Sequence, residues 1–123
     1  MYKFNFIIIL FFSFPISENK LKQARVTEYF ATQTIDYVDG ARENGDTKEY
    51  LFVRQTNAFL ERAKARLELG SLNAALEDVN TAVLRDPYKL ESYYYRGQIL
   101  SILGNYSSAI NNFDVIVKNN LFS

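Results

Sequence analysis

The 123-residue chain contains no cysteine and no histidine. The absence of cysteine excludes disulfides, thiolate nucleophiles and thiolate metal sites. The absence of histidine removes the commonest general base and the commonest metal ligand, and it excludes Ser-His-Asp and Cys-His catalysis within this chain. Carboxylate or lysine chemistry remains possible for an enzyme, but the sequence gives it no positive support. We therefore expect no metal site and no catalytic site.

An excess of charge of one sign is also missing, because 14 basic residues balance 14 acidic residues. A chain without a basic excess is poorly suited to neutralising phosphates, so we expect no nucleic-acid partner. The five glycines are scattered and form neither a GxGxxG nor a GKS/T phosphate loop. We therefore expect no cofactor and no small-molecule substrate.

The N-terminal segment Met1–Ser17 has the parts of a secretory signal peptide. Lys3 gives a short basic start, Phe6–Phe14 is apolar apart from one serine, and Pro15 breaks the run before a polar stretch. A membrane-spanning helix needs about 20 apolar residues, which is longer than this run. We predict a cleaved signal peptide at 1–17 and a chain in the endoplasmic reticulum lumen or secreted. An uncleaved membrane anchor is the alternative.

A second feature agrees with this location. Asn105-Tyr106-Ser107 is an N-glycosylation sequon, and it directly follows Gly104, where the chain is expected to turn. We predict Asn105 as the glycosylation site, in an exposed turn.

The sequence repeats itself with a period of 34 residues, the spacing of Gly70 and Gly104. Phe59–Pro87 and Tyr93–Leu121 align without a gap. The matched pairs are Phe59/Tyr93, Arg62/Arg96, Ala63/Gly97, Leu69/Leu103, Leu72/Tyr106, Ala75/Ala109, Leu76/Ile110, Val79/Phe113 and Val83/Val117. A period of this length indicates a stack of helix–turn–helix units.

Apolar residues recur at helical spacing along the chain, and no segment alternates with period two, so we predict an all-α fold without a sheet. The expected helices are Lys20–Glu43, Lys48–Leu69, Asn73–Arg85, Tyr93–Leu103 and Ser107–Lys118. Small residues, including Ala63, Gly97, Ala75 and Ala109, occupy equivalent places where helices should cross closely.

The repeats resemble the tetratricopeptide repeat (TPR) family. The first matches its pattern at Phe59, Ala63, Gly70, Leu72, Ala75, Ala82 and Pro87, and the second at Tyr93, Gly97, Gly104, Tyr106, Ala109 and Phe113. The departures are an early aromatic residue other than Trp, Arg62 and Arg96 for Leu, Arg66 and Leu100 for an aromatic residue, Ile116 for Ala and Leu121 for Pro. The resemblance implies a TPR-type solenoid of about two repeats, 56–89 and 90–123, after an N-terminal helical segment at 18–55 that forms a helical pair or cap.

The TPR resemblance also implies a function. The first helix of each repeat in this family lines a groove that holds a peptide or a partner's segment, so we expect a non-catalytic adaptor that binds a protein or peptide. The implied groove residues are Asn57, Leu60, Lys64 and Leu67 in repeat one, and Glu91, Tyr94, Gln98 and Ser101 in repeat two. Such a groove favours an apolar or mixed segment.

A signal peptide followed closely by TPR helices also resembles the lumenal endoplasmic-reticulum co-chaperones that join TPRs to a J domain. A J domain needs His-Pro-Asp, and this chain has no histidine, so only the N-terminal TPR part of those proteins is resembled. We expect a co-chaperone-like protein that binds a peptide or unfolded segment. The alternative is a structural subunit or an N-terminal fragment of a larger TPR protein.

Three further expectations concern charged and apolar side chains. Arg62 and Arg96 recur at one site, where we predict a structural ion pair. An enzyme would have to use carboxylates such as Glu77, Asp78 and Asp86, but carboxylates on helices usually serve as solvated or paired groups. The last two helices should leave apolar outer faces without a covering unit, which predicts self-association through the C-terminal repeat; these faces comprise Ile99, Ile102, Phe113, Ile116 and Val117.

Overall fold

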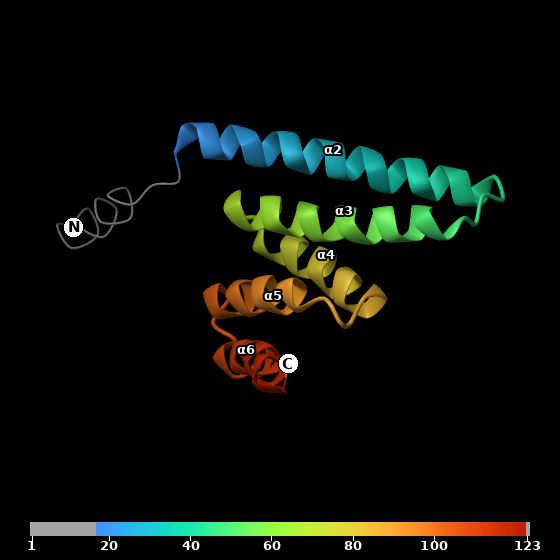
Figure 1. Cartoon of the computed structure of the whole chain (residues 1–123). Helices are drawn as coiled ribbons and strands as arrows, with labels where there is room; N and C mark the ends of the chain where they lie inside the picture. Colours follow the sequence, from blue (N-terminus) through green and yellow to red (C-terminus); the bar gives the residue numbers. More distant parts are fainter. Residues whose placement is uncertain (1–16, 123) are drawn as a thin grey trace.

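A computed structural model describes residues 17–122, which form five helices and no strand. The helices are α2 (Glu18–Glu43), α3 (Glu49–Glu68), α4 (Leu72–Arg85), α5 (Leu90–Ile102) and α6 (Tyr106–Phe122) (Figure 1). The all-α prediction is confirmed over this range, although α5 begins earlier than predicted. None of the helices in the described range is long and apolar enough to span a membrane. The predicted signal peptide lies almost wholly outside the described residues.

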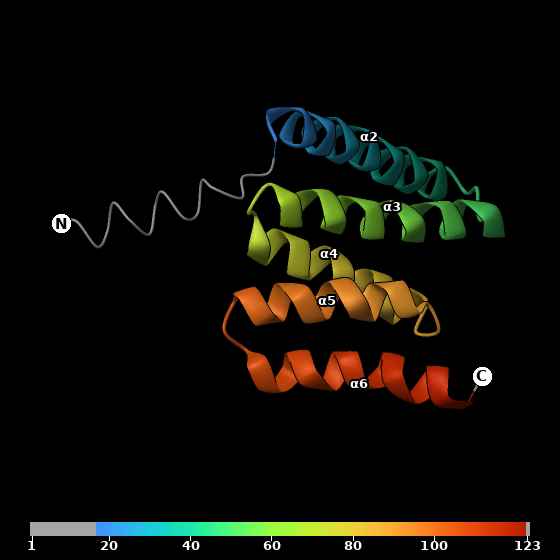
Figure 2. The same ribbon diagram turned by 60° about the vertical axis from the view of Figure 1, so that its left-hand side comes forward.

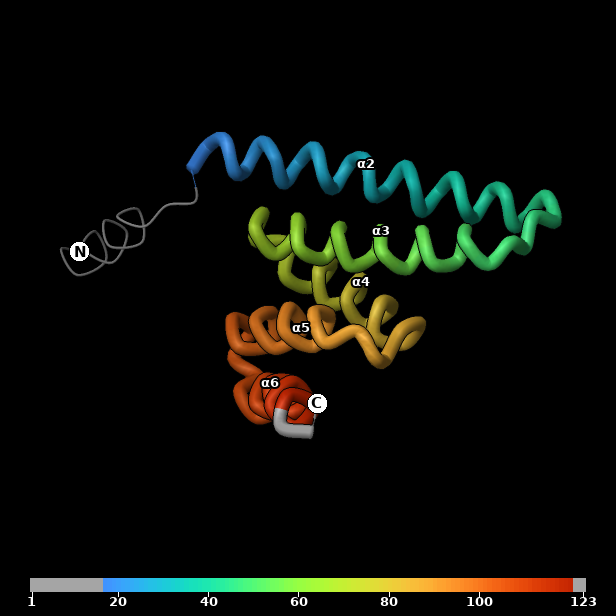
Figure 3. The backbone as a smooth tube through the Cα atoms, in the orientation of Figure 1, coloured from blue at the N-terminus to red at the C-terminus, as the bar shows by residue number. Residues whose placement is uncertain are grey.

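The helices stack in chain order. Each packs antiparallel against the next, and α2 and α6 lie at opposite ends of the stack (Figures 2 and 3). Helices α3 and α4 form the first predicted repeat, and α5 and α6 form the second. The helix–turn–helix solenoid that the 34-residue period predicts is therefore present. The division of the chain at 17/18, 55/56 and 89/90 stays a prediction.

Both repeats turn between their helices in the same way. Gly70 and Gly104 have φ angles of 79° and 85°, a left-handed conformation that glycine adopts at least cost. The residue after each glycine donates its backbone N–H to a carbonyl at the end of the preceding helix: Ser71 to Arg66 and Asn105 to Leu100, both at 2.8 Å. These bonds close the helix ends, so the repeated glycine fixes the repeated turn.

The core of the first repeat is built around small residues. Ala63 and Ala75 have no exposed surface, and they pack with four other buried residues, namely Leu60, Val79, Ala82 and Ile99. In the second repeat, Gly97 lies against the ring of Phe113 so closely that a Cβ atom would come within 2.6 Å of it. The prediction that small residues allow close helix crossings is confirmed. Ile99 was expected on an uncovered face, and this was wrong, because α5 turns that side chain into the core.

Helix α2 is joined to the repeats by an apolar seam and a polar bridge. Ala31 and Ile35 of α2 pack on Ala58 of α3. Beside them, the buried Gln55 donates from Nε2 to the carbonyl of Ile35 at 3.0 Å, and its Oε1 accepts from Arg85 Nη1 at 2.6 Å. This single amide therefore connects α2, α3 and α4, and it satisfies its own polar atoms in doing so.

Candidate protein-binding face

Helix α3 lies in the middle of one face of the stack and presents a polar ridge there. Its members recur every three or four residues, which keeps them on one side of a helix. We call this set the α3 ridge, and it consists of Arg54, Asn57, Glu61, Lys64 and Glu68. Two hollows flank it, so α3 forms a shared wall between them.

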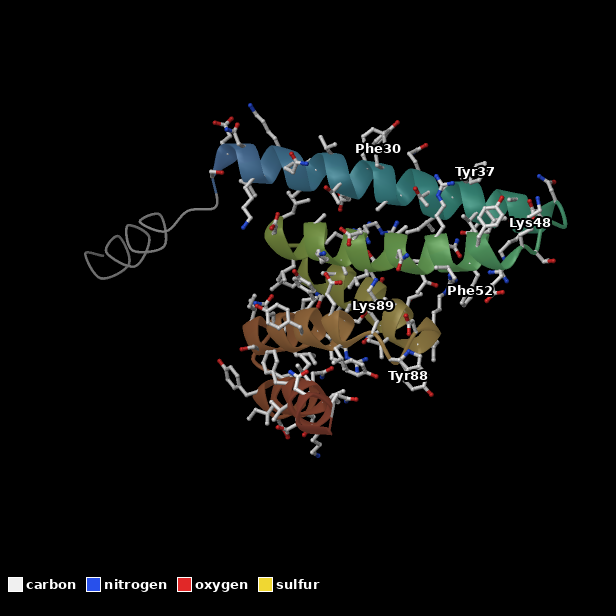
Figure 4. The ribbon with its side chains drawn as sticks, in the orientation of Figure 1. Phe30, Tyr37, Lys48, Phe52, Tyr88 and Lys89 are labelled. Atoms are coloured by element: carbon white, nitrogen blue, oxygen red, sulfur yellow. The ribbon has the colours of Figure 1, made fainter. Side chains whose placement is uncertain are left out.

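The first hollow lies between α2 and α3 and has a volume of about 450 Å³. The α2 side contributes Val26 and Phe30, which are 50% and 62% exposed. Phe30 lines the hollow from α2, and Tyr37, two turns further along α2 (both labelled in Figure 4), has its ring centre 5.9 Å from the guanidinium carbon of Arg54. The remaining lining residues are Gln23, Thr27, Ala31, Thr34, Arg54, Asn57, Ala58 and Glu61.

The second hollow lies among α3, α5 and α6 and also has a volume of about 450 Å³. Its apolar lining comes from Leu67, Ile102 and Phe113, one residue from each helix. Its polar lining comes from Glu68, Gln98 and Ser101. The hollow therefore offers an apolar surface with hydrogen-bonding groups beside it. This composition is typical of a site that binds a side chain with both apolar and polar atoms.

The charges between the hollows are paired. Lys64 Nζ lies 3.2 Å from Glu61 Oε1 and 2.8 Å from Glu91 Oε1, and it lies 5.2 Å from the centre of the Tyr95 ring. Burial lowers the pKa of Lys64, but the hydrogen bonds to Glu91 and Glu61 outweigh it, so the pKa is raised overall. Lys64 thus ties α3 to α5 as a cation, and its charge is already neutralised.

Most of the predicted groove residues reach this face. Leu67, Gln98 and Ser101 meet in the second hollow, and Asn57 lines the first. The Oδ1 of Asn57 accepts a 3.1 Å hydrogen bond from Lys89 Nζ at the start of α5. Tyr94 is 45% exposed and accepts a 3.1 Å bond from Gln98 Nε2.

Leu60 is a correction. It is only 1% exposed and packs in the core, so it has no surface to offer a ligand. The packing of α5 against α3 places Leu60 inside, whereas the family register had placed it in the groove.

Sequence reasoning missed the contribution of α2 to this face. Val26 and Phe30 lie in the segment at 18–55, which matches no repeat, so no register assigned them a role. The helical spacing of the buried Ala24 and Ala31 was visible, but it could not show which flank of α2 meets α3. Ile102 and Phe113 were assigned to uncovered outer faces of the last two helices, and Phe113 also matched the TPR pattern, but neither was assigned to the groove.

The other predicted residues fall elsewhere. Asn105 is exposed at the start of α6, and its Oδ1 accepts a 3.4 Å hydrogen bond from the backbone N–H of Ser108. Asp78, one of the carboxylates that an enzyme would need, is 4% exposed at its side chain and ion-paired with Arg62 and Arg66. This carboxylate therefore has a structural partner on each side.

The predicted ion pair at the recurring arginine is present in only one repeat. Arg62 binds Asp78 at 2.8 Å, as expected. Arg96 instead donates from Nε to the amide oxygen of Asn112 at 2.7 Å, and no ion pair of Arg96 is found within the described residues. The prediction was wrong for Arg96, because an asparagine stands where repeat one has an aspartate.

No protein-family model matches the chain, and no curated protein does. Among solved structures, the chain is similar to the second TPR of Spaghetti (RPAP3) bound to the HSP90 peptide SRMEEVD, with 22% sequence identity and a TM-score of 0.49. The similarity covers 81% of this chain and 95% of that one. The period, the helix order and the buried small residues of this chain are themselves those of a TPR-type helical solenoid.

Proposed function

We propose that this chain is a non-catalytic protein-interaction module, and that the face formed by α2, α3 and α5 binds an extended or helical segment of a partner protein. The observation that carries the proposal is the pair of hollows on either side of the α3 ridge. An occupant that crosses the ridge can place one side chain in each hollow, and apolar or aromatic side chains suit both.

The charge pattern narrows the class of partner. Lys64 is neutralised by Glu61 and Glu91, and Glu68 is paired with Lys20 at 3.5 Å. Apart from Arg54, for which no ion pair is found in the described part of the chain, a strongly acidic or strongly basic segment would therefore find little uncompensated charge on this face. We infer a partner segment with two apolar anchors and polar residues between them, which includes segments exposed in unfolded proteins.

Selection from a displayed peptide library tests this function directly. The full chain is immobilised beside Phe30→Asp and Leu67→Asp variants, which place a charge in the first and the second hollow. Tyr88→Asp is the matched control, because Tyr88 is 89% exposed at the α4–α5 turn, away from both hollows (Figure 4). We expect peptides with paired apolar residues to be enriched on the wild type and the control and lost on both hollow variants. Equal enrichment on all four proteins would contradict the proposal.

The cellular setting is part of the proposal. The basic start, short apolar run and following break in Met1–Ser17, together with the exposed sequon at Asn105, favour the secretory pathway and the lumen of the endoplasmic reticulum. A co-chaperone-like role fits this setting, since unfolded segments with apolar side chains are abundant there. An uncleaved N-terminal anchor is the alternative setting.

A second candidate function rests on a separate observation. Tyr106, Ile110 and Val117 are 65%, 58% and 54% exposed and lie along one side of α6. We infer that this stripe serves a structural subunit, through self-association or a permanent neighbour. Light scattering of the full chain and of Ile110→Asp at high concentration tests self-association. A wild-type dimer that the variant abolishes supports self-association, and a monomer in both counts against it.

A further inference from the structure

The two repeats place an arginine in the same position with the same bonding pattern. Arg62 donates from Nε to Asp78 at 2.9 Å and from Nη1 to Thr32 of α2 at 3.2 Å. Arg96, which lies 34 positions later, donates from Nε to Asn112 at 2.7 Å and from Nη1 to Asn80 of α4 at 3.3 Å. Each guanidinium therefore bridges the second helix of its own repeat and the helix that precedes the repeat.

The charge at the two positions differs. In repeat one, the Asp78 carboxylate accepts from Arg62 and Arg66, and Arg66 also binds Glu28 at 3.0 Å, so two carboxylates balance two arginines. In repeat two, Asn112 replaces Asp78 and Leu100 replaces Arg66, and the neutral Asn112 amide is fixed by its own 2.8 Å bond to the carbonyl of Ser108. The positive charge of Arg96 is left without a carboxylate in the described part of the chain.

The electrostatic surroundings agree with this difference. The hydrogen bond to Asp78 raises the pKa of Arg62, whereas burial lowers the pKa of Arg96. An arginine remains charged at neutral pH in either case. Arg96 is thus a half-buried cation that has lost part of its hydration and has gained only neutral amide acceptors and the ring of Tyr93, whose centre lies 5.3 Å away.

The uncompensated cation lies in an open hollow of about 330 Å³. Asn80, Asn111, Asn112 and Ser108 give this hollow a polar lining, and Leu76 and Leu100 give it an apolar side. No acidic residue lines it. Arg96 is two positions from both Tyr94 and Gln98, a rotation of about 200° around a helix, so the hollow lies on the opposite side of α5 from the proposed binding face.

We propose that this hollow, which we call the Arg96 hollow, binds a carboxylate supplied by an aspartate or glutamate side chain of a partner protein. The guanidinium fork matches a carboxylate in two parallel hydrogen bonds, and the carboxylate would restore the ion pair that Asp78 provides in repeat one. The two bonds that Arg96 already makes use only part of its five N–H donors. The hollow is roomy enough for a side chain, and its single cation matches one carboxylate better than a dianion.

The test is a titration of the full ¹⁵N-labelled chain, followed at the Nε–Hε resonance of Arg96. The probes are acetyl-Gly-Asp-Gly-amide, its isosteric control acetyl-Gly-Asn-Gly-amide, sodium acetate and inorganic phosphate. We expect the Asp peptide to shift the Arg96 resonance saturably, the Asn peptide to leave it unchanged, and the Arg62 resonance to move with neither. Phosphate binding more tightly than the Asp peptide would indicate a site for a free anion. Acetate binding without peptide binding would do the same, and either result would overturn the proposal.

Asn112→Asp provides the second measurement. This variant places an internal carboxylate on Arg96, so we expect it to weaken binding of the Asp peptide at least tenfold. The same peptide affinity in Asn112→Asp as in the wild type would overturn the proposal, as would no saturable shift in the wild type. The α2–α3–α5 face is untouched by this variant, so failure here is distinguishable from failure of the proposed groove.

Discussion

Arg62 and Asp78 form a bidentate ion pair between α3 and α4, with Nε 2.9 Å from Oδ2 and Nη2 2.8 Å from Oδ1. The Asp78 side chain is only 4% exposed and that of Arg62 only 14%, so little water screens the pair. Arg66 donates to the same carboxylate at 2.9 Å and continues to Glu28 of α2. The carboxylate of Asp78 is therefore the point at which α2, α3 and α4 are held together electrostatically.

Replacing Asp78 by asparagine should destabilise the fold. The substitution keeps the shape but leaves two arginines facing a neutral amide, and removing one partner of a buried ion pair costs about 3 kcal/mol. Urea unfolding of the full chain measures the free energy. Glu77→Gln is the matched control, because Glu77 is exposed on the same helix turn and should change the free energy by less than about 0.5 kcal/mol. Equal stability of the two variants would show that the pair contributes nothing.

Replacing Gly97 by alanine should overpack the contact with Phe113, and the free energy of this overpacking can be measured separately from helix propensity. An added Cβ would lie 2.6 Å from the ring of Phe113, whereas at Gly40 of α2 it would meet nothing within 4 Å. Both substitutions gain about 1 kcal/mol of helix propensity, so the difference between them isolates the overpacking, which we expect at about 1–3 kcal/mol. Thermal or urea unfolding of Gly97→Ala and Gly40→Ala gives that difference. Equal free energies would mean that the Phe113 ring moves aside without cost.

A larger side chain at the crossing of α3 and α4 should destabilise the fold. Ala75 has no exposed surface and lies in the core cluster, so Ala75→Leu should lower the free energy of unfolding by about 1–3 kcal/mol. Glu77→Leu, on the exposed side of α4, adds a similar apolar side chain without overpacking and serves as the control. An unchanged melting temperature for Ala75→Leu would contradict the register in which the repeats pack.

The proposed location can be tested by translating the full chain with microsomes. We expect a product that is protected from protease, shortened at its N-terminus, and reduced in mass by peptide-N-glycosidase. Asn105→Gln should abolish the last effect alone, because the residue is exposed at the start of α6 and its side chain holds only one hydrogen bond, at 3.4 Å. An unprotected and uncleaved product would contradict entry into the secretory pathway.

The periodic features of this fold were predictable from sequence because they depend on local rules. The 34-residue period located both glycine turns, and helical spacing located all five described helices. Small residues at equivalent positions identified the close crossings around Ala63 and Ala75. These features follow from backbone geometry and side-chain size, which neighbouring residues in the chain determine.

The features that escaped prediction depend on which helix faces which. Leu60 and Ile99 were assigned to surfaces, but the packing of α3, α4 and α5 buries both. The hollow beside Phe30 needs the flank of α2 that meets α3, and the segment at 18–55 has no repeat register to supply it. Predicting that Arg96 has no ion pair within residues 17–122 required a comparison of Asp78 with Asn112 across the two repeats. That difference is visible in the sequence, but it gains meaning only once both side chains are seen to bond the recurring arginine.

The most direct test of the account is the affinity of one selected peptide for three proteins. A library-selected peptide with two apolar anchors is titrated by fluorescence anisotropy into the wild type, Phe30→Asp and Tyr88→Asp. Phe30 and Tyr88 are both largely exposed, at 62% and 89%, so neither change should unfold the chain. We predict at least about a tenfold loss of affinity for Phe30→Asp, in line with the cost of losing one buried apolar anchor, and no change for Tyr88→Asp. Equal affinity for all three proteins would show that the face formed by α2, α3 and α5 does not bind the partner.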